Sequence, residues 1–190
     1  MLMNLPIFLT WLRIIAIPLF VGIFYLPPEL LPPATQNLVA TIIFGGAALT
    51  DWLDGYLARA LNQTSAFGAF LDPVADKLMV TAALIILVHL DRLDASIALI
   101  IIGREITISA LREWMAQIGK SKSVAVSLLG KVKTAAQMVA IPLLLYHDKV
   151  YELFDSQRIG TWLIYIAAVL TLWSMIYYLR AAIPHAIYHR

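Results

Sequence analysis

Four aspartates, Asp51, Asp54, Asp72 and Asp76, fall close together in a chain that is otherwise strongly apolar. Carboxylates that share a site repel one another, and removing them from water raises that cost, so they must take up protons or bind cations. Ligand sets made only of oxygen suit hard divalent ions such as Mg²⁺, Mn²⁺ or Ca²⁺. Four carboxylates are enough for two ions with bridging oxygens, an arrangement that recurs in displacement at phosphorus. The aspartates therefore predict a divalent-metal site that acts on a phosphorus centre.

The spacing of these aspartates predicts two helices that fold back on each other. Asp51 and Asp54 share one helical face, and so do Asp72 and Asp76. A continuous helix would hold the two pairs roughly 27 Å apart, too far for a single site. A polar break near Gln63 allows an antiparallel hairpin instead. In that hairpin Asp51 is level with Asp76 and Asp54 is level with Asp72, so we expect the pairs to face each other.

Small residues follow the same register between the two aspartate pairs. Gly55 and Ala58 lie about one turn apart, and Gly68 is level with Arg59. Glycine lowers helix stability by roughly 1 kcal/mol relative to alanine, so these positions indicate the close approach of a ligand or of a neighbouring backbone. In an alternative interpretation, the aspartates are only the ion-pair partners of Arg59 and Lys77.

The composition of the chain is typical of a membrane protein. Its 190 residues are 61% hydrophobic and 14% charged, whereas soluble domains rarely exceed about half apolar residues. The absence of cysteine excludes disulfides and thiolate metal sites, and a net charge of +2 does not favour nucleic acid as a partner. Spanning helices need roughly 20 apolar residues each. Six such segments are predicted, at 8–26, 36–61, 66–89, 94–118, 124–147 and 159–183.

We therefore expect an all-α integral membrane protein, a six-transmembrane-helix bundle with a short N-terminal interfacial segment at 1–7. Residues 1–190 are expected to form a single membrane-embedded catalytic domain, with the active site on the second and third helices. Lysine and arginine collect on the side of the termini and the aspartate hairpin, at Arg59, Arg112, Lys120, Lys122, Lys131, Lys133, Arg180 and Arg190, against Arg92, Lys149 and Arg158 on the other side. Because cytoplasmic loops are rich in these residues, the active site and both termini should face the cytoplasm.

Cations on the later segments indicate an anionic second substrate. They are Arg104 and Arg112 on the fourth segment and Lys131 and Lys133 on the fifth. Several cations at one cavity favour an acceptor that bears a phosphate. Alternatives stay open: Arg104 can pair with Glu105 or Asp51, and the two lysines can be membrane-surface anchors. Arg13 on the first segment either faces the cavity or reaches the membrane interface.

The string Asp51-x2-Asp54-Gly55-x2-Ala58-Arg59-x8-Gly68-x3-Asp72-x3-Asp76 resembles the signature of the CDP-alcohol phosphotransferases, and every defined position is filled. This resemblance implies the six-helix fold of that family and an enzyme that uses two divalent cations, Mg²⁺ or Mn²⁺, to act on a CDP-linked lipid. It implies that Asp51, Asp54, Asp72 and Asp76 bind the metal ions and that Asp76 is also the catalytic base. Gly55, Ala58 and Gly68 would make room for the cytidine, and Arg59 would contact the diphosphate.

Within the family, the stretches "NLPIFLTWLRIIAIP", "GREITISALRE" and "GKVKTAAQ" are similar to the bacterial phosphatidylglycerophosphate synthases. That likeness implies transfer of the phosphatidyl group from CDP-diacylglycerol to sn-glycerol 3-phosphate, in the bacterial inner membrane and in a homodimer. Arg104, Arg112, Lys131 and Lys133 would then bind the acceptor phosphate. One position departs from the family pattern, because Ile7 stands where a second asparagine is usual. This difference affects how the N-terminal segment packs against the rest of the protein.

Other functions remain as alternatives. Another acceptor, such as inositol phosphate or phosphatidylglycerol, would keep the same chemistry. A membrane prenyltransferase also holds a diphosphate through aspartates and divalent ions, but it does not need the glycine, alanine and arginine elements between the pairs. A cation or proton transporter would use the carboxylates to carry the ion, but neither repeats nor interrupted helices are evident in the sequence.

Overall fold

The computed structural model describes residues 5–60, 66–119, 128–150 and 154–187. Nearly all of these residues are helical, so the all-α class is confirmed. The helices are α1 (Leu5–Ile23), α2 (Pro33–Ala60), α3 (Ala66–His89), α4 (Ala95–Gln117), α5 (Leu128–Tyr146) and α6 (Ser156–Ile187). A short antiparallel ribbon of β1 (Lys149–Val150) and β2 (Phe154–Asp155) lies between α5 and α6, where the polar composition predicts only a turn.

The start of the chain differs from the sequence-based expectation. α1 begins at Leu5, so residues 5–7 continue the first helix and do not form a separate interfacial segment. Residues 1–4 lie outside the described ranges. Ile7, at the position that departs from the family pattern, is buried with 5% of its surface exposed. An apolar side chain therefore docks this end of α1 by packing.

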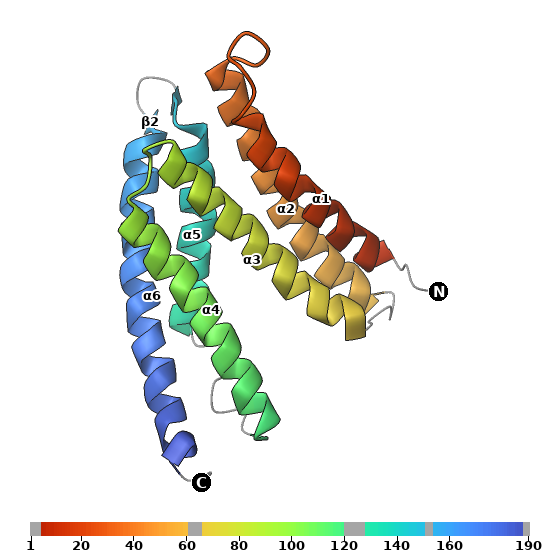
Figure 1. Ribbon diagram of the computed structural model, residues 1–190, viewed down its shortest axis with the longest axis vertical. Helices are drawn as coiled ribbons and strands as arrows, with labels where there is room; N and C mark the ends of the chain where they lie inside the picture. Colours follow the sequence, from red (N-terminus) through yellow and green to blue (C-terminus); the bar gives the residue numbers. More distant parts are fainter. Residues whose placement is uncertain (1–4, 61–65, 120–127, 151–153, 188–190) are drawn as a thin grey trace.

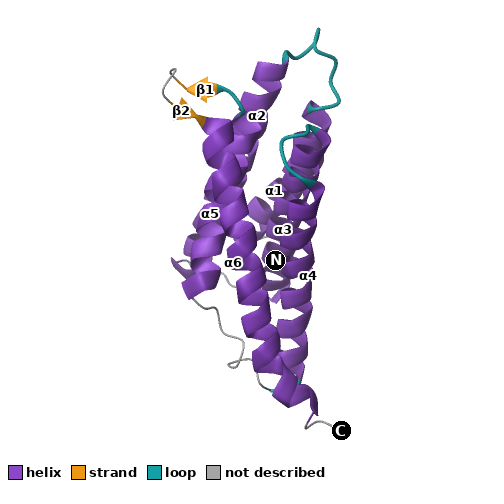
Figure 2. Ribbon diagram, turned by 90° about the vertical axis from the view of Figure 1, so that its left-hand side faces the viewer, coloured by secondary structure: helices purple, strands orange, loops and turns teal. Residues whose placement is uncertain are grey.

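The helices form an elongated bundle (Figure 2), but α5 and α6 run close to the long axis of the molecule whereas α1, α2 and α3 are clearly inclined to it in Figure 1. α1 packs against both α2 and α3, α5 packs against α6 and α2, and α4 packs against α6. The α2 and α3 ends nearest the hairpin, the end of α4 and the end of α6 lie in the lower half of Figure 1, and the start of α1 lies at about mid-height on the right. The loop between α1 and α2, the α3–α4 turn and the β ribbon lie at the opposite end.

A core built by all six helices occupies the part of the bundle nearer the ribbon. Its buried members include Phe20, Phe44, Leu87, Ile101, Leu144 and Ile164, one from each helix. A smaller cluster around Ile108 and Tyr178 joins α4 to α6 toward the other end.

Arg92, in the α3–α4 turn, fastens the ribbon end of the bundle. Its Nη1 donates to the carbonyl oxygens of Leu144 and Leu145 at 3.3 and 2.8 Å, and its Nη2 donates to Asn37 Oδ1 at 2.8 Å. The carbonyls belong to the last turn of α5, where a cation interacts favourably with the helix dipole. One side chain thus holds α2, the α3–α4 turn and α5 together.

Each of the six helices exposes large apolar side chains to the outside of the bundle. Examples, one per helix, are Leu19, Ile42, Phe70, Leu99, Val132 and Trp173. By length and composition alone, only one helix among the described residues could cross a membrane unaided, over Ser156–Arg180 of α6. Shorter apolar stretches occur at Ile7–Ile23 and Val132–Tyr146. Charged residues interrupt the apolar runs of α3 and α4.

Candidate active site

Arg13 brings together two aspartates from different helices. Its Nη1 donates to Asp51 Oδ1 on α2 at 3.1 Å and to Asp76 Oδ1 on α3 at 2.6 Å. Only 1% of the Arg13 side chain is exposed, against 41% and 36% for the two carboxylates. Arg13 therefore faces the aspartates and does not extend to a membrane interface. The two carboxylates lie at the same level, as the hairpin register predicts.

A second contact from α1 reaches a third aspartate. Thr10 Oγ1 donates to Asp72 Oδ1 at 2.5 Å, and Thr10 is fully buried. Thr10 and Arg13 are three positions apart and share a face of α1. This face contacts both α2 and α3. α1 therefore forms a third wall of the aspartate site.

Part of the predicted signature lies outside what the structure describes. The side chains of Asp54, Ala58 and Arg59, and the surroundings of Gly55, belong to that part. Gly68 is described and is buried on the first turn of α3. Among the described side chains, no three acidic or histidine residues are grouped closely enough to hold one metal ion, and Asp54 is not among the side chains considered.

The described aspartates nevertheless fit a divalent cation in their donor chemistry. Oxygens of Asp51 and Asp76, carried by two different helices, converge on one positively charged nitrogen. Asp72 lies on the face of α3 that carries Asp76, four positions away. Carboxylate oxygens are the ligands that hard divalent ions prefer.

Two cavities border these aspartates within the described residues. The first, here the α4 cavity, has a volume of about 300 Å³ and is lined by Asp72, Pro73, Asp76, Lys77, Val80, Glu105, Thr134, Gln137 and Met138. The second, here the α1 cavity, has a volume of about 260 Å³ and is lined by Arg13, Phe44, Ala47, Ala48, Asp51, Asp76, Met79, Val80, Thr134 and Met138. Asp76 lines both cavities, so a molecule in either one can reach its carboxylate.

Glu105 on α4 joins two buried cations at the edge of the α4 cavity. Lys133 Nζ from α5 donates to Glu105 Oε1, and Arg104 Nη1 donates to the same oxygen at 3.2 Å. Arg104 Nη2 also donates to Ser174 Oγ on α6 at 3.3 Å. The Lys133 and Arg104 side chains are 1% and 6% exposed. Because buried charges are costly unless they are paired, Glu105 stabilises both cations. The pairing of Arg104 with Glu105 is one of the alternatives that the sequence leaves open.

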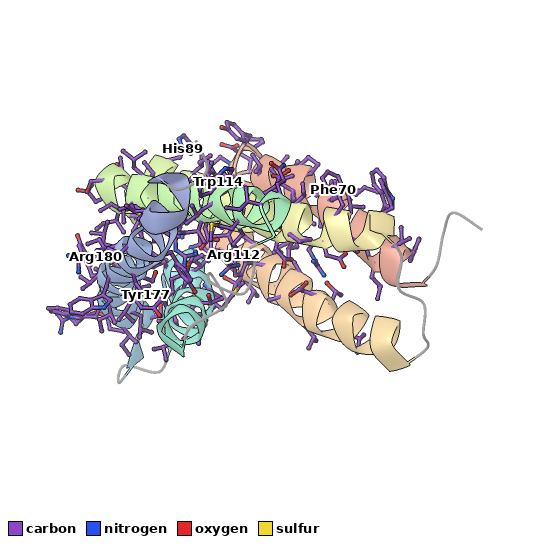
Figure 3. The ribbon with its side chains drawn as sticks, turned by 90° about the horizontal axis from the view of Figure 1, so that it is seen from below. Phe70, His89, Arg112, Trp114, Tyr177 and Arg180 are labelled. Atoms are coloured by element: carbon purple, nitrogen blue, oxygen red, sulfur yellow. The ribbon has the colours of Figure 1, made fainter. Side chains whose placement is uncertain are left out.

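Arg104 and Arg112 share an aromatic partner on α6. Their guanidinium carbons lie 5.8 and 5.6 Å from the ring centre of Tyr178, within cation–π range. Figure 3, viewed from the lower end, shows Arg112 toward the middle of the bundle and Arg180 toward its edge. Neither Arg104 nor Arg112 lines the two cavities, and the side chain of Lys131 lies outside the described part. Of the predicted acceptor-binding cations, Arg104 and Lys133 each contact Glu105, which belongs to the wall of the α4 cavity.

Three polar residues of this region were not predicted as site residues. The sequence alone does not single out Thr10, leaves Arg13 open between cavity and membrane interface, and indicates Glu105 only as a possible partner of Arg104. Thr10 and Arg13 did give a signal, because two polar residues three positions apart in an apolar helix must share a face. Glu105 is an isolated carboxylate well inside an apolar segment, which is by itself an indication of function.

Comparison with known proteins shows the family of this chain. The family model for CDP-alcohol phosphatidyltransferase matches residues 3–173. The chain is 54% identical over 181 residues to the CDP-diacylglycerol–glycerol-3-phosphate 3-phosphatidyltransferase of Haemophilus influenzae, covering 94% of this chain and 93% of the relative. It is 51% identical to the proteins of the same name from Shigella flexneri and Escherichia coli K12, and each alignment covers 94% of this chain and 94% of the relative. The chain belongs to the CDP-alcohol phosphatidyltransferase family.

Proposed function

We propose that this protein transfers the phosphatidyl group of CDP-diacylglycerol to the primary hydroxyl of sn-glycerol 3-phosphate, giving phosphatidylglycerophosphate and CMP. The observation that carries the proposal is the convergence of Asp51 and Asp76 on one positive charge, next to two cavities that meet at Asp76. The names of relatives that are 51–54% identical over nearly the whole chain support the choice of substrates.

The aspartates are the proposed metal ligands. Asp51, Asp54, Asp72 and Asp76 would hold two divalent cations, Mg²⁺ or Mn²⁺, and the contacts of three of them with α1 support a fixed arrangement of oxygens. Cations bound there would neutralise the diphosphate and the negative charge that develops on the departing CMP.

Asp76 is the proposed base. The primary hydroxyl of the acceptor gives its proton to the Asp76 carboxylate while its oxygen forms a bond to the β-phosphorus of CDP-diacylglycerol. The bond from that phosphorus to the bridging oxygen breaks, and CMP leaves with the electron pair. The place of Asp76 in the walls of both cavities supports this role, because the acceptor hydroxyl must lie beside the base and close to the phosphorus of the donor.

The residues expected to bind the nucleotide are proposed from the family pattern. Gly55, Ala58 and Gly68 would leave room for the cytidine, and Arg59 would contact the diphosphate. The burial of Gly68 at the start of α3 is consistent with a close approach at that position.

The four cations Arg104, Arg112, Lys131 and Lys133 would provide the positive potential that attracts the acceptor phosphate. Lys133 and Arg104 share the single carboxylate of Glu105, so this corner of the molecule keeps a net positive charge. An electrostatic attraction of this kind raises the local concentration of an anionic substrate.

We further propose that all six helices lie in a membrane, as a single catalytic domain over residues 1–190. The large apolar side chains that each helix exposes support this arrangement, since a soluble bundle would bury them. The distribution of lysine and arginine favours a cytoplasmic position for the active site and both termini. The location would be the bacterial inner membrane, and the apolar outer face of α6 would be available for a homodimer contact.

The test is an acceptor screen with purified protein in lipid or detergent. We expect release of CMP from radiolabelled CDP-diacylglycerol when sn-glycerol 3-phosphate and Mg²⁺ or Mn²⁺ are both present, and no release after chelation. Inositol phosphate and phosphatidylglycerol serve as alternative acceptors. Faster turnover with either of these would reject the proposed acceptor, and cation flux through vesicles without CMP release would reject the enzymatic reaction altogether.

A further inference from the structure

The α4 cavity contains a cation and an amide that the interactions described so far do not use. Lys77 on α3 and Gln137 on α5 line it together with Asp76 and Glu105. Within the described part of the chain, neither the Lys77 nor the Gln137 side chain makes a hydrogen bond or a close ion pair, and Lys77 interacts with Glu105 only through its charge at longer range. Lys133, by contrast, is already paired with Glu105. Lys77 is therefore the cation in this wall that is available to a ligand.

The burial of Gln137 is the second, independent observation. Only 4% of its surface is exposed. A side-chain amide carries two donor hydrogens and an acceptor oxygen. Gln137 lines the α4 cavity, and its amide atoms are not among the fully buried polar atoms without a partner in the described part of the chain, so the amide is open to the cavity and can hydrogen-bond a polar molecule there.

Three helices bring these groups to one cavity. Lys77 lies on α3, Glu105 on α4 and Gln137 on α5, and all three line the α4 cavity. Asp76 is the neighbour of Lys77 in the chain. A proton acceptor, a cation and an amide therefore surround one small space.

We propose that Lys77 and Gln137 hold the acceptor in the α4 cavity. This assignment rests on the proposed function. Lys77 binds the phosphate of the acceptor, Gln137 hydrogen-bonds its secondary hydroxyl, and the primary hydroxyl lies beside Asp76. The volume of about 300 Å³ is at the small end of ligand sites and suits a three-carbon phosphate monoester. Asp51 and Arg13 line only the α1 cavity, which leaves that side for the donor.

Steady-state kinetics of CMP release test the two residues with separate probes. Lys77→Met should raise the KM for sn-glycerol 3-phosphate about tenfold or more, the effect of removing a charged hydrogen bond, with kcat and the KM for CDP-diacylglycerol little changed. Lys77→Arg should restore most of the affinity. For Gln137 the probe is 3-hydroxypropyl phosphate, which lacks the secondary hydroxyl. The wild-type enzyme should use it about tenfold less well than glycerol 3-phosphate, and Gln137→Leu should lose that preference.

Matched controls lie on α6 at the other end of the bundle, where Arg158→Met and Gln157→Leu should leave both substrates unaffected. If Lys77→Met does not fold, amine modification of the wild-type protein replaces it: glycerol 3-phosphate should slow modification of Lys77 and not of Lys149. The assignment is overturned if Lys77→Met leaves the KM for the acceptor unchanged or changes only the KM for the donor. It is also overturned if glycerol 3-phosphate does not protect Lys77, or if Gln137→Leu keeps the preference for glycerol 3-phosphate. In each of these cases the proposed function stands. A wild-type enzyme inactive with glycerol 3-phosphate overturns both.

Discussion

Arg13 on α1 donates to Asp76 on α3 over 2.6 Å, although the two residues are 63 positions apart in the chain. The same nitrogen reaches Asp51 on α2. No residue of the aspartate signature lies on α1, yet this helix determines how the two signature helices present their carboxylates. The first helix is therefore a structural part of the site.

Replacing Arg13 by glutamine should weaken both the fold and the activity. The change leaves a buried position without its charge and allows Asp51 and Asp76 to repel each other. We expect destabilisation of about 1–3 kcal/mol, the range for hydrogen bonds to charged groups, because the two carboxylates are partly exposed and partly screened by solvent. Thermal unfolding in detergent measures it. Arg13→Lys, which keeps the charge, should recover part of the loss; equal losses in the two variants would contradict the ionic explanation.

Asp76→Asn tests the proposed base. The amide keeps the shape of the side chain but cannot accept the hydroxyl proton, so turnover should fall by about 100-fold or more, while nucleotide binding is largely kept. CMP release and protection of the protein by CDP measure the two effects. Asp91→Asn is the control, since Asp91 lies in the α3–α4 turn with a φ of 54° that asparagine tolerates. Near-normal turnover by the Asp76 variant would disprove the assignment.

His147, after the end of α5, should make the stability of the ribbon end depend on pH. The pKa of His147 lies below its ordinary value of 6.5, mainly because the side chain is partly buried and to a smaller extent because of the positive charge of Arg92. The unfolded chain then binds the proton more tightly than the folded protein does. The stability contributed by neutral His147 is therefore fully present above about pH 6.5 and declines as the pH falls toward the lower folded-state pKa. The Tm of the wild-type protein should therefore drop between pH 7.5 and 5.5.

The matched variant for this effect is His147→Asn, because the φ of His147 is 61° and asparagine accepts that conformation without titrating. Its Tm should change less over the same pH interval. If the variant and the wild-type protein lose stability equally, the pH dependence belongs to other groups.

The proposed orientation is testable because the chain contains no cysteine. Single cysteines at Gln117, which ends α4, and at Gln157, in the first turn of α6, lie at exposed positions at opposite ends of the bundle. A membrane-impermeant maleimide added to intact cells without an outer-membrane barrier should label Gln157→Cys at once and Gln117→Cys only after permeabilisation. The reverse pattern would invert the orientation.

The level pairing of Asp51 with Asp76 could be predicted because it depends only on helix periodicity and on the place of a polar break. Helix boundaries followed in the same way from local composition. The contacts of Arg13 and Thr10 could not, since they require the rotation of α1 about its axis. That rotation is decided by packing against α2 and α3, which are far along the chain.

The later helices show the same limit. Arg104 and Glu105 are neighbours in sequence, and their charges alone do not reveal which of them borders a cavity. Packing of α4 against α6 turns Arg104 toward Ser174 and Tyr178, which leaves Glu105 on the cavity side. For the same reason Lys77 was considered only as a possible partner of the aspartates, although it contributes to the cavity wall.

The two cavities share Asp76, Val80, Thr134 and Met138, but Glu105 of α4 lines only the α4 cavity, and residues of α1 and α2 line only the α1 cavity. Donor and acceptor can therefore occupy the enzyme at the same time, and neither has to leave before the other arrives. Such an enzyme follows a sequential kinetic scheme: double-reciprocal plots for the two substrates should intersect, and labelled CMP should not exchange into the lipid nucleotide in the absence of acceptor.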